Sequence, residues 1–294
     1  METLYQACNR REYVHPDPLE FLYAYDDPRD QELVGLLAAC LAYGRVTQIL
    51  ASIRGALDRL SAGSRASPSR VLARAAPREI FHRLDGFKHR FTTGGEVASL
   101  LVAARRAVET QGSLERLFAG AVGQGDTTVL PALAVFVRRL RELAGGPEAC
   151  ATLLSSPEDG SACKRLNLFL RWMVRRDSVD PGPWAGIRPA LLVVPLDTHL
   201  FRIAGRMGLT RRRQPNLRTA LEITERFAEI SPDDPVRYDF ALTRFGINPT
   251  LRGSRSRPAF TLPAGPPVAP GSRSGPGRGQ KQTQGSRSQR AAPP

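Results

Sequence analysis

The chain has 294 residues, of which 41% are hydrophobic, enough for one large domain or two lobes with an ordinary buried core. Its formal net charge is +14; eight basic residues and no acidic residue follow Thr250, so the body carries +6. This charge favours phosphate-bearing partners, although a basic tail can also serve solvation alone. The longest apolar window, Leu33 to Ala42, is far shorter than the roughly 20 residues that span a bilayer. We therefore expect a soluble, cytoplasmic protein without a membrane partner.

The cysteines, Cys8, Cys40, Cys150 and Cys163, show no Cys-x-x-Cys motif and no paired spacing. This distribution is typical of free thiols in a reducing compartment and indicates no zinc or iron–sulfur site. Only four histidines are present and they are scattered, which gives no other ligand set. We expect neither a metal ion nor another cofactor.

In chain order, the predicted elements are helices. Prolines favour an extended opening within residues 1–29. From Asp30, apolar residues at spacings of three and four predict two helices, which Tyr43-Gly44-Arg45 separates. Short helical pieces follow between 61 and 94, and longer helices at about 95–110, 113–120 and 128–143. Because an alternating strand pattern is almost absent, the predicted fold class is all-α.

Within the short pieces, Phe87-Lys88-His89-Arg90-Phe91 interleaves aromatic and basic residues. Such a run can hold a nucleic-acid strand, and the alternative is a packed helix end.

The second half is predicted to contain helices from about Ala162, after Asp197, over 215–230 with Asn216 as cap, and over 235–245. Phe169 and Trp172 fall within the first of these helices and are expected in the core. After Thr250 the composition is dominated by Gly, Pro, Ser, Arg and Gln, which cannot bury enough apolar surface to fold. We therefore predict a helical domain over residues 1–250 and a disordered basic tail over 251–294.

Lysine is rare in this chain: of 42 basic residues only Lys88, Lys164 and Lys281 are lysines. Arginine keeps its proton at physiological pH and cannot form a Schiff base, whereas a desolvated lysine can lose its proton and form one. Lys164 falls in the first turn of a predicted helix, after a turn in which Gly160 supplies left-handed geometry and Ser161 a candidate N-cap. The helix dipole is positive at that end, which favours an uncharged amine. The alternative is an ordinary solvated lysine on a surface helix.

Asp197 follows Pro195-Leu196 and precedes another predicted helix. Its simplest role is to cap that helix, and capping is compatible with catalysis because backbone N–H groups would fix the direction of the carboxylate. A folded hairpin would bring Asp197 and Lys164 into one cleft, as a nucleophile and its base or electrostatic partner.

Two motifs carry a family resemblance: Gly160-Ser-Ala-Cys-Lys-Arg-Leu-Asn and Leu196-Asp-Thr-His-Leu-Phe-Arg. Together they resemble the helix-hairpin-helix DNA glycosylases of the endonuclease III type, in which a lysine after the hairpin attacks the sugar C1′ and an aspartate assists. Leu37-Ala-Ala-Cys-Leu-Ala-Tyr-Gly-Arg-Val resembles an early helix and strand-wedging loop of that family, and Asp239-Phe-Ala-Leu-Thr-Arg-Phe-Gly-Ile its closing helix. The likeness covers about residues 30–250 and is closest to an uncharacterised bacterial branch.

The resemblance implies a two-lobed helical fold with an interlobe cleft, and a monomeric enzyme that acts on double-stranded DNA in base excision repair. It implies a glycosylase, with or without abasic-site lyase activity, in which Lys164 and Asp197 are the catalytic residues. The residues that it assigns to DNA binding are Tyr43, Gly44, Arg45, Gln48, Gly160, Ser161, His199 and Arg202.

Of three departures from this pattern, the one in the hairpin bears most on function. The usual hairpin Leu-Pro-Gly-Val-Gly is replaced by an acidic turn that contains Glu158 and Asp159, where backbone amides should meet a phosphate. Two alternatives follow: a non-catalytic nucleic-acid-binding protein on the same fold, and a structural or partner-binding helical protein whose basicity comes from the tail. The resemblance favours an enzyme, a DNA glycosylase or abasic-site lyase, over these two alternatives.

Overall fold

The computed structural model describes residues 1–146 and 148–247, and this part of the chain is mostly helical. The α-helices are α1 (Glu2–Cys8), α2 (Pro28–Cys40), α3 (Val46–Ser61), α4 (Pro68–Arg74), α5 (Pro77–Arg83), α6 (Gly94–Gln111), α7 (Leu114–Ala119), α8 (Leu130–Ala144), α9 (Lys164–Val174), α10 (Thr198–Arg206), α11 (Leu217–Ala228) and α12 (Asp239–Ile247). Short 3-10 helices occupy Arg11–Tyr13, Pro18–Ala24, Pro157–Asp159 and Pro189–Leu191. The predicted helical class is confirmed.

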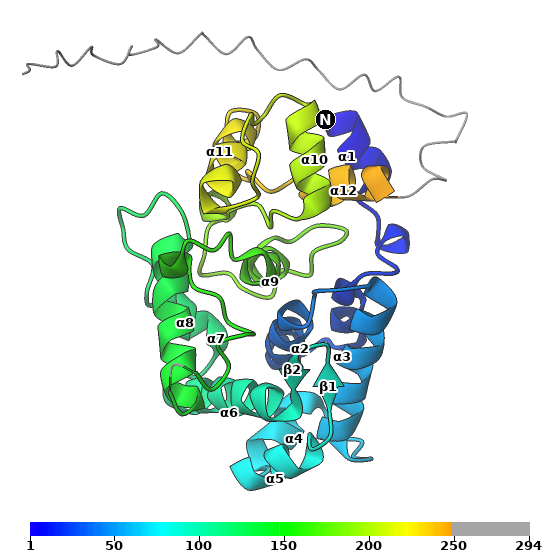
Figure 1. The fold of residues 1–294 in the computed structure, drawn as a ribbon, viewed down its shortest axis with the longest axis vertical. Coiled ribbons are helices and arrows are strands. Elements are labelled where there is room, and N and C mark those ends of the chain that lie inside the picture. Colours follow the sequence, from blue (N-terminus) through cyan, green and yellow to red (C-terminus); the bar gives the residue numbers. More distant parts are fainter. Residues whose placement is uncertain (147, 248–294) are drawn as a thin grey trace, which may run out of the picture.

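Helix α9 lies at the centre of the fold (Figure 1). It packs against α2, which belongs to the group α2–α8 at one end of the molecule. At the other end α10, α11 and α12 gather with α1, and α12 packs against both α1 and α10. Lys164 therefore opens a helix that lies between the two groups.

Local sequence sets the helix boundaries. The side chain of Asp27 caps α2 ahead of a first-turn proline, and Asn216 caps α11 as predicted. Thr93 and Glu96 form a reciprocal capping box at the start of α6. Helix α8 ends where Gly145 adopts a φ of 112°.

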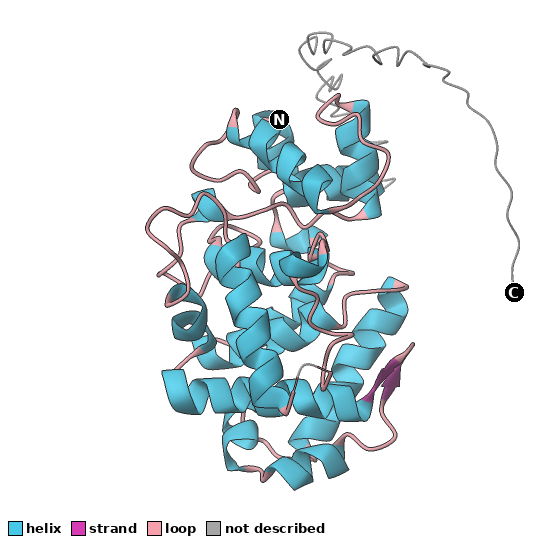
Figure 2. Cartoon of the chain, turned by 60° about the vertical axis from the view of Figure 1, so that its left-hand side comes forward, coloured by secondary structure: helices cyan, strands magenta, loops and turns pink. Residues whose placement is uncertain are grey.

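The structure differs from the local expectations at four places. The opening contains a helix that was not expected, α1, which lies ahead of the extended proline segment and whose Leu4, Tyr5 and Cys8 are buried. Ser161 is not the N-cap of α9; Cys163 holds that position with a φ of 46°. Figure 2 shows a small hairpin of two strands, β1 (Lys88–His89) and β2 (Thr92–Thr93), each too short to give an alternating pattern. The last helix starts at Asp239, four residues later than expected.

The core is continuous across both groups of helices. Phe169 and Trp172 are fully buried, as predicted, and Phe169 packs edge to face on Trp184 with ring centroids 5.3 Å apart. The four cysteines are unpaired and buried, and burial raises the pKa of Cys40 to about 12.

In the part of the chain that the structure describes, no helix has the length and apolar character needed to cross a bilayer. The predicted disordered tail, residues 251–294, lies outside the described residues, and so does the predicted domain boundary.

Candidate functional site

Lys164 is the first residue of α9, in the first turn as predicted. Its side chain is half-buried, and among the described residues its amine has no hydrogen bond or ion pair. The preceding residue, Cys163, accounts for this sharp start: its left-handed backbone turns the chain into the helix, and its N–H donates to Ser161 Oγ at 3.1 Å. The structure thus presents an unpaired amine at the N-terminus of the central helix.

Arg165 fixes the start of α9 against α2. Its Nη1 donates to the carbonyl oxygen of Cys40 at 2.8 Å, and its Nη2 donates to the carbonyl oxygen of Thr152 at 2.7 Å. Its guanidinium carbon lies 5.2 Å from the centroid of the Tyr43 ring. Because Arg165 follows Lys164 directly, these contacts tie the first turn of α9 to Tyr43 of the predicted wedge loop Tyr43-Gly44-Arg45.

Tyr43 belongs to an aromatic and basic surface that we call the Tyr43 platform, made of Tyr43, Arg90, Phe91 and Arg165. The rings of Tyr43 and Phe91 stack with centroids 4.9 Å apart, and the Tyr43 hydroxyl donates to the carbonyl oxygen of His89 at 2.9 Å. Phe91 is 61% exposed, which is unusual for so large an apolar side chain. The β1–β2 hairpin therefore carries an open aromatic face to the start of α9.

His89 supports the platform from beneath. Its ring contacts Ser52 Oγ at 2.8 Å and the Tyr43 carbonyl oxygen at 3.0 Å, and burial lowers the pKa of the imidazole. Gly44 has a φ of 102°, and a Cβ at this position would lie 2.9 Å from Arg90 Cδ. The loop Tyr43-Gly44-Arg45 thus requires glycine for its conformation, and the Arg90 side chain packs closely against it.

Arg45 and Gln48 flank the platform at the start of α3. Arg45 immediately precedes the helix and Gln48 lies in its first turn, and both side chains are exposed. Their spacing of three residues places them on neighbouring positions of the helix surface.

The turn before α9 differs from the expected turn between two helices. Gly145 and Gly146 end α8, and a run of turns and one 3-10 helix follows before α9 begins. Gly160 has the predicted left-handed conformation with a φ of 69°. The exposed acids of this turn face α8: Glu158 lies 3.7 Å from Arg138, and Asp159 lies 3.8 Å from Arg141. Their negative charge is therefore partly balanced within the chain.

Asp197 caps α10, as predicted: its Oδ1 accepts from the N–H of Leu200 at 2.7 Å. The carboxylate is half-buried, whereas His199 and Arg202 are exposed on the outer side of α10. Among the described residues, Asp197 and Lys164 form no hydrogen bond or ion pair with each other.

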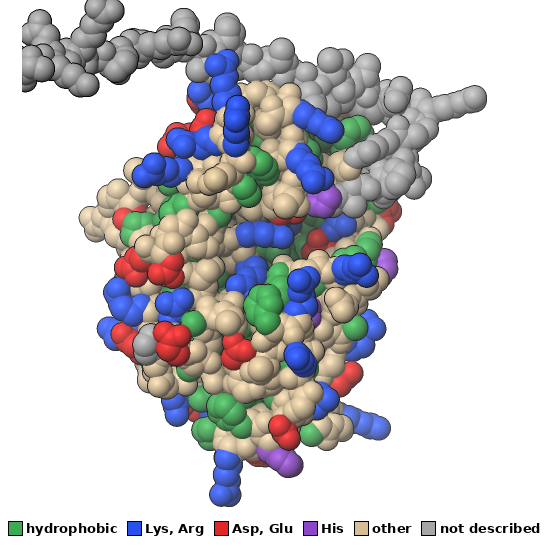
Figure 3. Space-filling view, in the orientation of Figure 1, with side chains coloured by type: hydrophobic (Ala, Val, Ile, Leu, Met, Phe, Trp, Pro, Cys, Tyr) green, Lys and Arg blue, Asp and Glu red, His purple; other side chains and the backbone are tan. Residues whose placement is uncertain are grey.

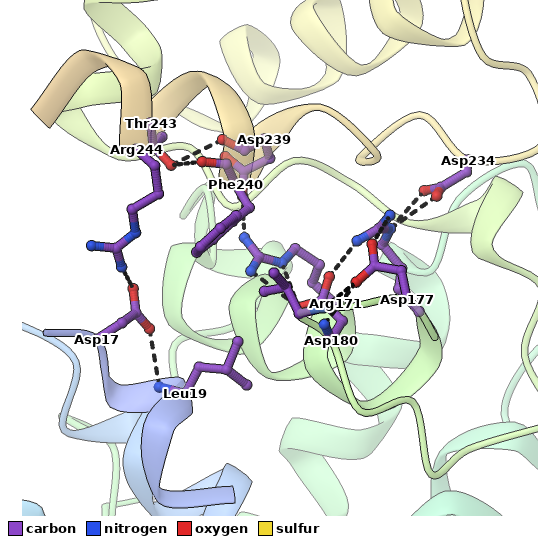
Figure 4. Close-up of polar contacts among 12 residues, drawn as sticks. Asp17, Leu19, Arg171, Asp177, Asp180, Asp234, Asp239, Phe240, Thr243 and Arg244 are labelled. Carbon is purple, nitrogen blue, oxygen red and sulfur yellow. Dashed lines mark hydrogen bonds and ion pairs between the residues drawn. The ribbon is translucent and has the colours of Figure 1, made fainter. Parts of the chain in front are cut away.

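A buried ion-pair network joins α9 to α12 (Figure 4). Arg171 binds Asp180 at 3.0 Å and Asp239 at 2.5 Å, and all three side chains are almost fully buried. The pKa of Asp239 is raised to about 6, mainly by burial, which Arg171 opposes and the carboxylate of Asp197 reinforces. Asp197 therefore lies within electrostatic reach of Asp239.

Arg171 also indicates where this network lies relative to the candidate nucleophile. Lys164 and Arg171 are seven residues apart, so they project from the same side of α9, about 10 Å apart along its axis. Lys164 and the Arg171–Asp239 ion pair therefore lie on the same side of one helix.

A pocket of about 220 Å³ lies elsewhere, between α2, α4 and α6, with Leu33, Leu72 and Arg105 among its lining residues. Neither Lys164 nor Asp197 lines it. The candidate site at the start of α9 is therefore not part of this pocket.

Three residues of the site were not identified from the sequence. Arg165 bonds to backbone carbonyls, which leave no sequence signal. Phe91 was noted only within an aromatic and basic run, with packing as the alternative. Arg171 could have been found, since an arginine inside the apolar run Leu-Phe-Leu-Arg-Trp-Met indicates a buried, paired charge.

The fold and the site together define a helical protein whose central helix begins with a lysine that has no polar partner among the described residues, and is tied through Arg165 to an exposed aromatic and basic surface. The chain belongs to the family described as "Protein of unknown function (DUF2400)", which matches residues 17–248. No curated protein and no solved structure is significantly similar to it.

Proposed function

We propose that this protein is a DNA glycosylase of the helix-hairpin-helix type that excises a damaged base through Lys164, with accompanying abasic-site lyase activity. The observation that carries the proposal is the position of Lys164 at the start of α9, where Arg165 ties the helix to the Tyr43 loop. A target nucleotide taken out of the duplex leaves a gap in the base stack. An exposed aromatic and basic surface near the start of α9 could fill that gap by stacking on the neighbouring bases and contacting the phosphates.

In the proposed reaction the uncharged amine of Lys164 attacks C1′ of the deoxyribose. The glycosidic bond from C1′ to the base breaks as the bond from Lys164 Nζ to C1′ forms, and the base leaves with the bonding electron pair and takes up the proton that the attached amine loses. The ring oxygen then takes up a proton from solvent as the sugar ring opens, which gives an iminium ion between Lys164 and the sugar. Asp197 would stabilise the positive charge that develops on the sugar, and its bond to the N–H of Leu200 fixes its direction.

The site residues receive matching roles. Tyr43, Gly44 and Arg45 would occupy the gap left by the flipped nucleotide, with Gln48 at its edge. Gly160 and Ser161 would meet a phosphate ahead of α9, while His199 and Arg202 would contact the backbone beyond Asp197. The two groups of helices around α9 would correspond to the two lobes of the glycosylase fold, with the DNA between them.

A second candidate, a non-catalytic nucleic-acid-binding protein on the same fold, is favoured by one observation. Glu158 and Asp159 are exposed in the turn that should hold a phosphate, and their pairing with arginines of α8 is too long to neutralise them fully. In this case the Tyr43 platform binds DNA and Lys164 has no chemical role.

The two candidates differ in covalent chemistry. The full-length protein is incubated with duplexes that carry an abasic site or an oxidised base, in the presence of borohydride, which reduces an iminium to a stable amine. We expect a covalent protein–DNA adduct with the wild type and none with Lys164→Gln. Absence of an adduct on all lesions, with DNA binding retained, would establish the non-catalytic candidate.

Lys88→Gln is the matched control. Lys88 is exposed on β1, and its replacement removes the same charge as Lys164→Gln. Because Lys88 is not the proposed nucleophile, the adduct should persist in this variant. An adduct that survives Lys164→Gln and disappears with Lys88→Gln would refute the proposed assignment.

A further inference from the structure

The chain from Thr198 to Arg218 contains six arginines and one histidine and no acidic residue. It covers α10, the following loop and the first turn of α11. One of the six, Arg212, is paired with Glu222 at 2.5 Å. The other five have no carboxylate partner among the described residues; we call them the α10–α11 arginine strip: Arg202, Arg206, Arg211, Arg213 and Arg218.

The strip faces solvent because of the pattern of α10. Leu200, Ala204 and Met207 are buried against the rest of the protein, so positions 199, 202 and 206 fall on the opposite side of the helix. All five arginines of the strip are exposed. Figure 3 shows Lys and Arg side chains over α10, α11 and their connection, and again across the middle of the same face.

Helix stability does not account for this charge. Arg218 is the second residue of α11, where the helix dipole is positive and a cation is unfavourable. The positive charges of arginines along one surface repel one another. Because no acidic residue lies between 198 and 218, nothing within the segment offsets this repulsion. An external polyanion would supply that compensation.

The dimensions of the strip fit a nucleic-acid backbone. Residues 199 to 206 span about 10 Å along α10, which corresponds to about three successive phosphates of one strand of B-DNA. The exposed side of α10 offers no large apolar side chain that would enter a lipid bilayer. Guanidinium groups pair with phosphate in a bidentate manner.

We infer that the α10–α11 arginine strip is a docking surface for the phosphate backbone of duplex DNA, adjacent to Asp197 at the start of α10. The inference rests on the proposed function for the identity of the polyanion. It extends that function by assigning the sequence-independent part of the affinity to Arg206, Arg211, Arg213 and Arg218 in addition to Arg202. The strip would hold undamaged duplex before any base is engaged.

The experiment measures binding of an undamaged 20-base-pair duplex to the full chain by fluorescence anisotropy, at several salt concentrations. In the strip variant, Arg202, Arg206 and Arg211 are each replaced by glutamine. We expect at least a tenfold weaker affinity, and a slope of log K against log salt that is smaller by about 0.9 for each phosphate that the variant no longer binds. Circular dichroism melting verifies that the variant is folded.

The matched control replaces Arg70, Arg74 and Arg78 by glutamine. These arginines of α4 and α5 are exposed and lie at the opposite end of the molecule, and their replacement removes the same total charge. Equal losses of affinity in both variants would overturn the inference, since net charge alone would then explain binding. So would an unchanged duplex affinity in the strip variant, or strip-dependent binding to phosphatidylserine vesicles in preference to duplex.

The result is separable from the catalytic proposal. Lys164→Gln should remove the adduct and leave the strip dependence of duplex affinity and of its salt slope in place. A wild-type protein that forms no adduct but shows the strip dependence would refute the glycosylase and leave the docking surface standing. An adduct with no strip dependence would refute the docking surface and leave the glycosylase standing.

Discussion

Replacing Arg165 by alanine tests the organisation of the candidate site without touching the proposed nucleophile. The variant loses a charge-assisted bond to the partly buried Cys40 carbonyl, worth about 2 kcal/mol, and a more exposed bond to Thr152, worth about 1 kcal/mol or less. It also loses the cation–π interaction with the Tyr43 ring, worth about 0.5–1 kcal/mol at an exposed site. We expect the free energy of unfolding to fall by about 3 kcal/mol.

Urea unfolding followed by circular dichroism measures this change. Arg165→Lys should recover only about half of the loss, since one ammonium group cannot match the fork of the guanidinium that reaches two carbonyls. Arg70→Ala, at an exposed arginine of α4, is the control and should change stability by about 0.5 kcal/mol or less. If Arg165→Ala behaves like Arg70→Ala, the start of α9 is not held against the Tyr43 loop and the site as described is wrong.

Three further expectations follow from the same contacts. Phe91→Ala should weaken binding to DNA with an unpaired base by about 1–3 kcal/mol, whereas Phe81→Ala, another exposed phenylalanine, should leave it unchanged; equal effects in an anisotropy assay would argue against the platform. Asp197→Asn should keep most of the α10 cap, whereas Asp197→Ala should lose about 1 kcal/mol of stability. Neither variant should form the borohydride adduct at the wild-type rate. Adduct formation by Asp197→Asn at the full rate would show that the negative charge is unnecessary. The pKa of Asp239 is raised from 3.8 to about 6, so its protonated form stabilises the fold. This contribution to the free energy of unfolding is lost as the pH rises from about 4 through 6, and the loss is about 3 kcal/mol at most. Asp239→Asn should lack that decline, and parallel stability–pH curves for the two proteins would contradict the burial of an ionisable group there.

Much of the helical framework could be predicted because it depends on local signals. Apolar spacing placed α2, α3, α6 and α8 within a few residues, and side-chain caps placed the starts of α10 and α11. The Gly160 turn was likewise visible, since its conformation needs glycine. Cys163 was not, because a left-handed cysteine at an N-cap follows from tertiary packing of its buried thiol and not from its own preference.

The candidate site was only half accessible from the sequence. Lys164 could be predicted as a candidate because arginine stands at almost every other basic position, and Asp197 because it precedes an amphipathic helix. The anchoring of the start of α9 through Arg165 depends on the backbone carbonyls of Cys40 and Thr152, which any residue could supply. The relation of Asp197 to α9 runs through Asp239, 42 positions further along the chain, and long-range pairs of this kind leave no periodic signal.

The most direct measurement is the site of covalent attachment. A borohydride-reduced complex of the full-length protein with abasic duplex is digested with protease and nuclease, and the modified peptide is sequenced by mass spectrometry. We expect the reduced sugar on the side chain of Lys164 and on no other lysine. A sugar on Lys88, Lys281 or the terminal amine, with Lys164 unmodified, would contradict the assignment of this residue as the nucleophile.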